Sequence, residues 1–202
     1  MNKTALWLLL FFVVLIWSGI HPKETLTWFL EVVPALLALP ILYFTRKRFP
    51  LTSLAYVLIL IHAVILMVGG HYTYAEVPLF DTLAEWMGSE RNNYDKVGHF
   101  AQGFIPALLA REVIIRVAMV KPGAWCNFFV CCFALALSAL YELIEWWVAV
   151  LIGEDAESFL GTQGYVWDTQ SDMAMALLGA IVCVITLSRW HNRQLTAYIN
   201  LR

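Results

Sequence analysis

Residues 51–70 read LTSLAYVLILIHAVILMVGG, a run without a single charged side chain. At about 1.5 Å of rise per residue, a helix of this length spans the roughly 30 Å hydrocarbon core of a bilayer. The rest of the chain has the same character, because 61% of the 202 residues are hydrophobic and only 14% are charged. A soluble domain of this size carries more charge. We therefore predict an all-α protein that crosses a membrane several times.

Apolar runs on both sides of this stretch extend the prediction to a polytopic bundle of six transmembrane helices. The predicted spans cover about residues 5–20, 25–44, 51–70, 98–120, 125–152 and 173–190. No repeat or low-complexity tract separates them, so residues 1–202 are expected to form a single transmembrane domain. The two halves are not inverted copies of each other, which weakens the commonest signature of a transporter.

The orientation of the bundle follows from its basic residues, since cytoplasmic loops are rich in Lys and Arg. With six spans, both termini lie on the same side as the loops after the second and fourth spans. That side collects ten of the thirteen basic residues, namely Lys3, Arg46, Lys47, Arg48, Arg111, Arg116, Lys121, Arg189, Arg193 and Arg202. We therefore predict that both termini are cytoplasmic.

Three pairs of polar residues stand in or beside the last three spans, all toward the outer side. Their members are three or four residues apart, so a helix places each pair on one face. The pairs are Asp95 with His99, Glu142 with Glu145, and Asp168 with Asp172. Charged groups inside a bilayer are costly and normally face a partner or a polar cavity. We therefore expect the three pairs to meet in one site in the outer half of the bundle.

Each pair also has a purely structural interpretation. Asp95 and Asp168 are placed where an acidic residue caps a helix. His99 alone is typical of a packed, hydrogen-bonded histidine. For Glu142 and Glu145 this interpretation is weakest, because two facing carboxylates in a membrane need protons, cations or a metal. Among the other histidines, His62 stands alone in mid-span, and His21 and His191 are flanking residues that we expect to have no polar neighbours.

Two kinds of chemistry suit the combined set. One is binding of a divalent cation, with mainly oxygen ligands that favour Mg²⁺, Ca²⁺ or Mn²⁺ over zinc. The ligands would be Asp95, His99, Glu142, Asp168 and Asp172. The other is acid–base catalysis without a metal, with a buried Glu as acid and His99 as base. The sequence contains no nucleophilic Ser-His-Asp spacing, phosphate-binding Gly loop or His-Glu-x-x-His motif.

Four segments carry a resemblance to a known family. They are residues 69–74 (GGHYTY), 94–104 (YDKVGHFAQGF), 141–146 (YELIEW) and 161–173 (GTQGYVWDTQSDM). Together they resemble the YjdF-type family of bacterial inner-membrane proteins, over nearly the whole chain. The resemblance implies a multi-pass protein of the bacterial inner membrane and no particular activity.

A more distant similarity is to VanZ-like membrane proteins, which have an Asp-Lys-x-x-His-Phe opening, a later membrane Glu and an Asp-x-x-x-Asp helix start. Here these elements match residues 95–100, Glu142, and Asp168 with Asp172. Glu145 stands where that pattern has Gln. The similarity implies a role in the cell envelope and a lipid or lipid-linked glycan as substrate.

Our leading hypothesis is a membrane-embedded envelope enzyme that acts on the headgroup of a lipid or lipid-linked glycan. Its catalytic residues would be Asp95, His99, Glu142, Glu145, Asp168 and Asp172. Its substrate-binding residues would be Arg91, Lys96, Gln102, His71, Tyr72, Gln163 and Gln170. A small cation- or proton-coupled transporter and a non-catalytic scaffold are the alternatives, so enzymatic activity itself stays open at this point. The expected partners are membrane lipids and no nucleic acid, and the sequence does not set the oligomeric state.

Overall fold

The computed structural model describes residues 2–152, 157–160 and 162–199, so Gly161 of the fourth family-like segment lies outside the described residues. All regular structure in these residues is helical, as predicted. The helices are α1 (Lys3–Gly19), α2 (Thr25–Thr45), α3 (Ser53–Tyr72), α4 (Pro78–Met87), α5 (Tyr94–Arg116), α6 (Ala124–Ile152), α7 (Glu157–Leu160) and α8 (Asp168–Ile199). By length and hydropathy, α2, α3, α6 and α8 are each able to cross a membrane, and α1 is a shorter apolar helix.

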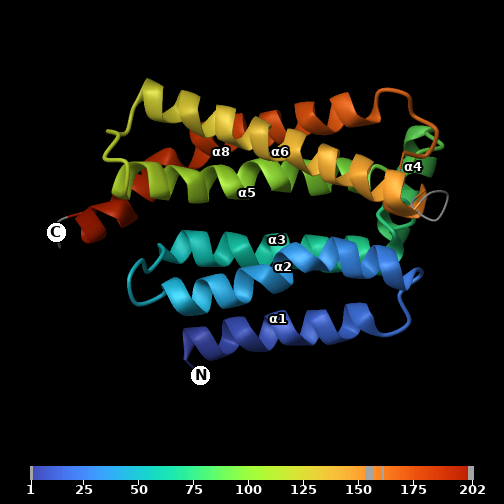
Figure 1. The fold of residues 1–202 in the computed structure, drawn as a ribbon, viewed down its shortest axis with the longest axis horizontal. Helices are drawn as coiled ribbons and strands as arrows, with labels where there is room; N and C mark the ends of the chain where they lie inside the picture. Colours follow the sequence, from blue (N-terminus) through green and yellow to red (C-terminus); the bar gives the residue numbers. More distant parts are fainter. Residues whose placement is uncertain (1, 153–156, 161, 200–202) are drawn as a thin grey trace.

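The long helices run side by side along the long axis of the molecule (Figure 1). Helix α3 contacts α1 and α2, while α5 contacts α6 and α8, and the two groups meet where α3 packs against α5. The start of α1 and the end of α8 lie at one end of the bundle, and the short helix α4 lies at the other (Figure 1). Most of the predicted site residues lie on the helices near the α4 end.

Two helices differ in extent from the predicted spans. Helix α5 begins at Tyr94 rather than near residue 98, because Asp95 and Lys96 turn into the protein and continue the helix. It ends at Arg116, shortly before Met119, whose positive φ of 56° is incompatible with a continuing helix. Helix α8 runs from Asp168 to Ile199, well past the apolar stretch that marked its predicted span.

Close packing between α5 and α8 depends on two glycines. A Cβ atom at Gly103 would lie 1.7 Å from the Ala176 carbonyl oxygen, and one at Gly179 would lie 2.1 Å from that of Phe100. Backbones can approach this closely only where a side chain is missing, as is common between membrane helices. This contact sets how α5 and α8 face each other, and the site lies at its α4 end.

The packing of the Tyr74 ring explains why glycine and tyrosine recur in residues 69–74 (GGHYTY). Tyr74 follows α3 with a positive φ of 58°, and its ring packs between α3 and α5. A Cβ at Gly69 would lie 2.2 Å from this ring, and one at Gly98 would lie 2.7 Å from it. The ring of Tyr94 makes an edge contact with the ring of Tyr74 at 5.5 Å between centroids. The two glycines therefore make room for an aromatic ring that fills the space between the two groups of helices.

Candidate functional site

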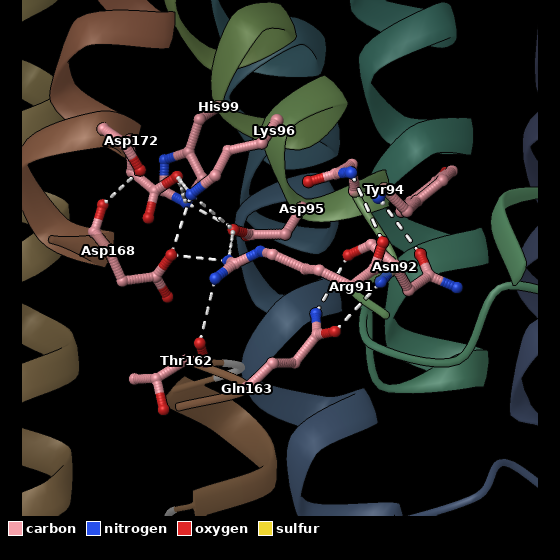
Figure 2. A network of polar contacts seen from close by, with 12 residues as sticks. Arg91, Asn92, Tyr94, Asp95, Lys96, His99, Thr162, Gln163, Asp168 and Asp172 are labelled. Atoms are coloured by element: carbon pink, nitrogen blue, oxygen red, sulfur yellow. Dashed lines mark hydrogen bonds and ion pairs between the residues drawn. The ribbon is translucent and has the colours of Figure 1, made fainter. Parts of the chain in front are cut away.

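Two cations and three carboxylates form a buried network at the α4 end of the bundle (Figure 2). Lys96 Nζ donates to Asp168 Oδ1 at 2.8 Å and to Asp172 Oδ1 at 2.5 Å. Arg91 Nη2 donates to the same Asp168 oxygen at 2.5 Å and lies 3.6 Å from Asp95 Oδ2. All three carboxylate residues are buried. Ion pairs that are buried away from water in this way are only weakly screened by salt, in contrast to pairs on a surface.

The loops on either side of the network are joined by amide hydrogen bonds. The Gln163 side chain accepts from Asn92 N at 3.0 Å and donates to Asn92 O at 2.9 Å. Asn92 is buried, and its own amide donates to Val77 O and to Asp81 Oδ1. Arg91 Nη1 donates to Thr162 O at 3.0 Å (Figure 2). The segments before α4, α5 and α8 are therefore fastened together around the ion network.

His99 lies one turn further along α5, where both of its ring nitrogens face oxygen atoms. Nε2 lies 3.3 Å from Asp95 Oδ1, and Nδ1 lies 3.1 Å from Gln102 Oε1. With the Gln102 amide placed this way, both nitrogens act as donors, which describes an imidazolium. Arg91, Lys96 and a cationic His99 thus face the carboxyl groups of Asp95, Asp168 and Asp172.

A second set of carboxylates lies around His99 on the neighbouring helices. Glu142 Oε1 of α6 is 3.8 Å from His99 Nδ1, and it is buried without a hydrogen-bond partner among the described residues. Glu145, three residues on, is half-buried. Tyr141 donates its hydroxyl to Glu31 Oε2 of α2 at 3.3 Å, and its ring lies edge-on to His99. The structure therefore brings the three predicted pairs together.

The charges of the network act on the two titratable groups in the first turn of α5. Burial by itself raises the pKa of Asp95, but the hydrogen bond from His99 and the positive charges of His99, Lys96 and Arg91 outweigh it. The pKa of Asp95 therefore lies below its usual range. Burial opposes the charge of Lys96, but its hydrogen bonds to Asp168 and Asp172 raise the pKa of its ammonium group above the usual value. Both groups are held in their charged forms.

Three of the five predicted metal ligands have donor atoms close enough to share one ion. Atoms of Asp95, His99 and Asp172 all lie within 4.8 Å of one another. Asp168 instead pairs with Arg91 and Lys96, and Glu142 approaches only His99. The Lys96 ammonium is already in contact with Asp172. A divalent cation bound to these three residues would compete with Lys96 for the same carboxylate.

A pocket of about 420 Å³ lies beside the network. It is lined by the two cations together with polar and apolar side chains, namely Arg91, Asn93, Lys96, Tyr165, Ser171, Ala174 and Met175. The Arg91 guanidinium lies 5.2 Å from the centroid of the Tyr165 ring. Arg91 and Lys96 thus belong both to the pocket wall and to the ion network, which connects the pocket with the buried carboxylates.

The remaining predicted substrate-binding residues have different surroundings. Gln102 contacts His99, and Gln163 holds the loops as described above. His71 Nδ1 is 3.0 Å from Ser18 O, and the His71 ring packs against Trp17 and Tyr72 at the junction of α1 and α3. Gln170 is exposed and makes no hydrogen bond within the described part of the chain. His71, Tyr72 and Gln170 therefore do not line the pocket.

Sequence reasoning missed Glu31, which is buried and joins the site through Tyr141. It is the single charged residue of the predicted second span, residues 25–44. A single charged residue in a long apolar run is itself a signal, because burying it in a bilayer requires a partner.

It also missed a second buried network at the opposite end of the bundle, around Glu112. Glu112 is fully buried and accepts from Thr52, from Arg116 Nη1 at 2.5 Å and from His191 Nε2 at 3.1 Å. Arg111 Nη1 lies 3.1 Å from His191 Nδ1, which makes Nδ1 the acceptor and leaves the proton on Nε2. The expectation that His191 lacks polar neighbours is therefore wrong, because its neighbours come from α5, eighty positions away. Apart from Arg111 Nε, which has no hydrogen-bond partner among the described residues, the polar groups named here pair with one another, and we interpret this network as structural.

The fold and site together define a polytopic helical membrane protein with a buried ion network at one end of its bundle. Residues 3–193 match a family model described as a predicted membrane protein, DUF2238, and the chain belongs to this family. It is similar to the inner membrane protein YjdF of Escherichia coli strain K12, with 53% identity over 198 residues that cover 98% of this chain and 93% of that protein. No solved structure matches. The chain is thus a multi-pass protein of the inner membrane, and the resemblance to the YjdF-type family is confirmed.

Proposed function

We propose that this protein is a membrane-embedded envelope enzyme that acts on the anionic headgroup of a lipid or lipid-linked glycan. In this proposal α1, α2, α3, α5, α6 and α8 all cross the membrane, and both termini lie in the cytoplasm. The abundance of basic residues at the end away from α4 supports this orientation, even after the buried Arg111 and Arg116 are left out. The pocket then opens toward the outer face of the membrane.

The observation that carries the proposal is the Glu142 Oε1 atom, which is buried and has no hydrogen-bond partner among the described residues. Leaving a buried carboxylate oxygen unpaired costs about 1–3 kcal/mol or more. A protein that only needed α6 for packing would gain stability by replacing this residue. The atom lies 3.8 Å from His99 Nδ1, so a group bound beside the two atoms would contact both side chains.

Headgroup binding is assigned to Arg91 and Lys96, which line the pocket. A guanidinium group and an ammonium group together bind phosphate well, because the first offers a planar pair of donors and the second a compact charge. Tyr165 and Met175 in the same wall offer an apolar surface for the part of a lipid next to its headgroup.

The proposed chemistry is proton transfer at the bound headgroup. His99 is oriented by Asp95 and Gln102 and has protons on both nitrogens, so it is the donor to a leaving oxygen. Glu142 is the acceptor for the proton of an attacking water or hydroxyl. These roles are the reverse of those expected from the sequence, because the oxygen atoms that face both His99 nitrogens favour its protonated form.

A metal-assisted version uses Asp95, His99 and Asp172 as ligands for Mg²⁺, Ca²⁺ or Mn²⁺. The cation would replace the Lys96 ammonium at Asp172 and one of the two ring protons of His99. We favour the metal-free version for this reason, and bound metal in the purified protein, measured by elemental analysis, distinguishes the two.

The experiment compares the membrane lipids of cells that produce Glu142→Gln or His99→Ala with those that produce the wild type. Glu85→Gln serves as the matched control, since Glu85 is an exposed carboxylate on α4 at the same end of the bundle. The proposal expects a headgroup-modified lipid or lipid-linked glycan to change in abundance with both site variants and not with the control. Equal lipid profiles in all strains, with all variants present in the membrane, would contradict it.

A proton-coupled transporter is the second candidate, favoured by the contact between Tyr141 and Glu31. This contact extends the polar site from α5 and α6 to α2, toward the interior of the bundle. Uptake that depends on a pH gradient in vesicles containing the purified protein, and its loss in Glu31→Gln, would support transport over catalysis.

A further inference from the structure

A long groove runs along the membrane-facing side of the bundle between α2, α3 and α5, away from the site described above. Its volume is about 440 Å³, and its walls are apolar except for His62 and Thr45. Small residues such as Ala38 of α2 and Ala63 of α3 leave the space that larger side chains would fill. The rim includes exposed apolar residues, among them Ile41 and Val117.

The length of the groove follows from the residues that line it. On α2 they extend from Pro34 to Thr45, and on α5 and just past its end from Ile105 to Val117. At 1.5 Å per residue these stretches are about 16 and 18 Å long. The groove therefore runs parallel to the helices and extends to the end of the bundle opposite α4.

Three consecutive basic residues, Arg46, Lys47 and Arg48, stand at that end of the groove. They lie between Thr45 and Phe49, which both line it, and all three are exposed. None of them forms a salt bridge within the described residues, and Arg46 lies over the ring of Tyr43 at 3.7 Å. The Arg46 guanidinium also donates to the Tyr43 carbonyl oxygen, a neutral partner that leaves its charge uncompensated. Three cations without a carboxylate partner among the described residues, at the end of a membrane groove, attract anionic lipid headgroups, each cation contributing about 1 kcal/mol.

We propose that the groove binds one acyl chain of an anionic phospholipid whose phosphate group is held by Arg46, Lys47 and Arg48. The three exposed cations at its end decide between this ligand and a helix from another chain or a second copy. They complement a phosphate group, whereas the apolar face of a helix would offer them no anion. An acyl chain is thin, apolar and already parallel to the helices of the bundle. The site is separate from the Arg91–Lys96 pocket and does not depend on the proposed function.

The test counts lipids bound to the delipidated, detergent-solubilised full chain by native mass spectrometry, during titration with phosphatidylglycerol or phosphatidylcholine. Ala38→Trp fills the groove, and Leu37→Trp is its control, because Leu37 is on the same helix, exposed and outside the groove. Replacing Arg46, Lys47 and Arg48 by Gln removes the headgroup site. The control for this triple variant replaces Lys121, Arg189 and Arg193 by Gln, three exposed basic residues at the same end of the bundle.

The wild type, Leu37→Trp and the second triple variant are expected to bind one phosphatidylglycerol, with about tenfold or greater preference over phosphatidylcholine. Ala38→Trp is expected to lose this binding about tenfold or more, and the Arg46–Lys47–Arg48 variant is expected to lose the preference. If Ala38→Trp does not fold, as judged by thermal unfolding, Ala38→Phe replaces it. The proposal is overturned if the wild type shows no preference, if Ala38→Trp binds like Leu37→Trp, or if Ala38→Trp converts a dimer into a monomer with lipid binding unchanged.

Discussion

At the scale of single residues, Lys96 is the centre of the candidate site. It contacts Asp168 and Asp172 of α8 and lies 3.5 Å from Asp95 of its own helix. Asp95 and Asp168 are therefore more than helix caps, since their carboxylates face cations rather than the backbone NH groups of a helix end. The catalytic roles of these residues stay a prediction, whereas their mutual contacts are a property of the fold.

Replacing Lys96 by Met should destabilise the protein by about 3–5 kcal/mol, because the buried Asp172 loses its nearest cation and the buried Asp168 keeps only Arg91. The Lys23–Glu76 pair offers a matched comparison, since both of its side chains are about half exposed. Lys23→Met should change the free energy of unfolding by only about 0–1 kcal/mol. Chemical unfolding in detergent measures both, and adding Asp172→Asn to Lys96→Met should recover part of the loss. Similar losses in the two single variants would show that the network contributes no more than a surface pair.

Acid should weaken the wild type more than the variant Asp95→Asn. Because the pKa of Asp95 is lowered on folding, its charge stabilises the fold above the unfolded value of about 3.9. This contribution is lost as pH falls through the lower, folded pKa. Thermal unfolding between about pH 3 and pH 7 should therefore show the difference between wild type and Asp95→Asn shrinking in acid. The exposed Glu85→Gln should follow the wild type at each pH, and a constant difference for Asp95→Asn would exclude the lowered pKa.

At the scale of elements, α5 is the helix whose contacts do most to set the arrangement of the bundle. It contacts α3, α6 and α8, begins at the ion network and ends at the Glu112 network. Gly98 and Gly103 serve different purposes on it, since one receives the Tyr74 ring and the other the backbone of α8. The four helices α2, α3, α6 and α8 are recognisable as membrane spans by their apolar length. Helix α5 is instead positioned by polar pairs at both of its ends.

The variant Gly103→Ala should be strongly destabilising, although alanine is the better helix former by about 1 kcal/mol. The new Cβ would lie 1.7 Å from the Ala176 carbonyl oxygen, so α5 and α8 would have to separate. Overpacking of this kind costs about 1–3 kcal/mol or more, which outweighs the gain in propensity. Thermal unfolding in detergent checks it, with Gly123→Ala as control because nothing lies within 4 Å of a Cβ there. An unchanged transition for Gly103→Ala would mean that the two helices are not held this closely.

At the scale of the whole molecule, two polar networks lie at opposite ends of an apolar bundle. The ion network around Lys96 is next to a pocket, whereas the Glu112 network is buried and mostly paired internally. This asymmetry favours one functional end and one structural end.

Membrane orientation is tested by labelling single added cysteines with a reagent that does not cross membranes. Glu90 and Arg193 are both exposed, and they lie at opposite ends of the bundle. Glu90→Cys should react in intact spheroplasts, and Arg193→Cys should react only after the cells are opened, with the parent chain as the blank for the native cysteines. The reverse pattern would place the pocket on the cytoplasmic side and contradict the proposed orientation.

The helical membrane class was predictable from sequence, because apolar length and the lack of charge depend only on neighbours along the chain. The same holds for the pairing of Asp95 with His99, since four residues on a helix is one turn. The starts of α5 and α8 were placed too late, because hydropathy detects where apolar residues begin and not where a buried polar residue continues the helix.

Only the tertiary structure decided which of these polar residues meet. Lys96 reaches Asp172 across 76 positions, and His191 reaches Glu112 across 79. Such contacts depend on the order and rotation of packed helices, which the glycines of α5 and α8 set through backbone contact. Residues 92–103 were therefore recognisable in sequence as a polar segment at a helix start. Their role as one wall of an ion-pair network came from the packing, because an ion pair is defined by distance in space and not by spacing along the chain.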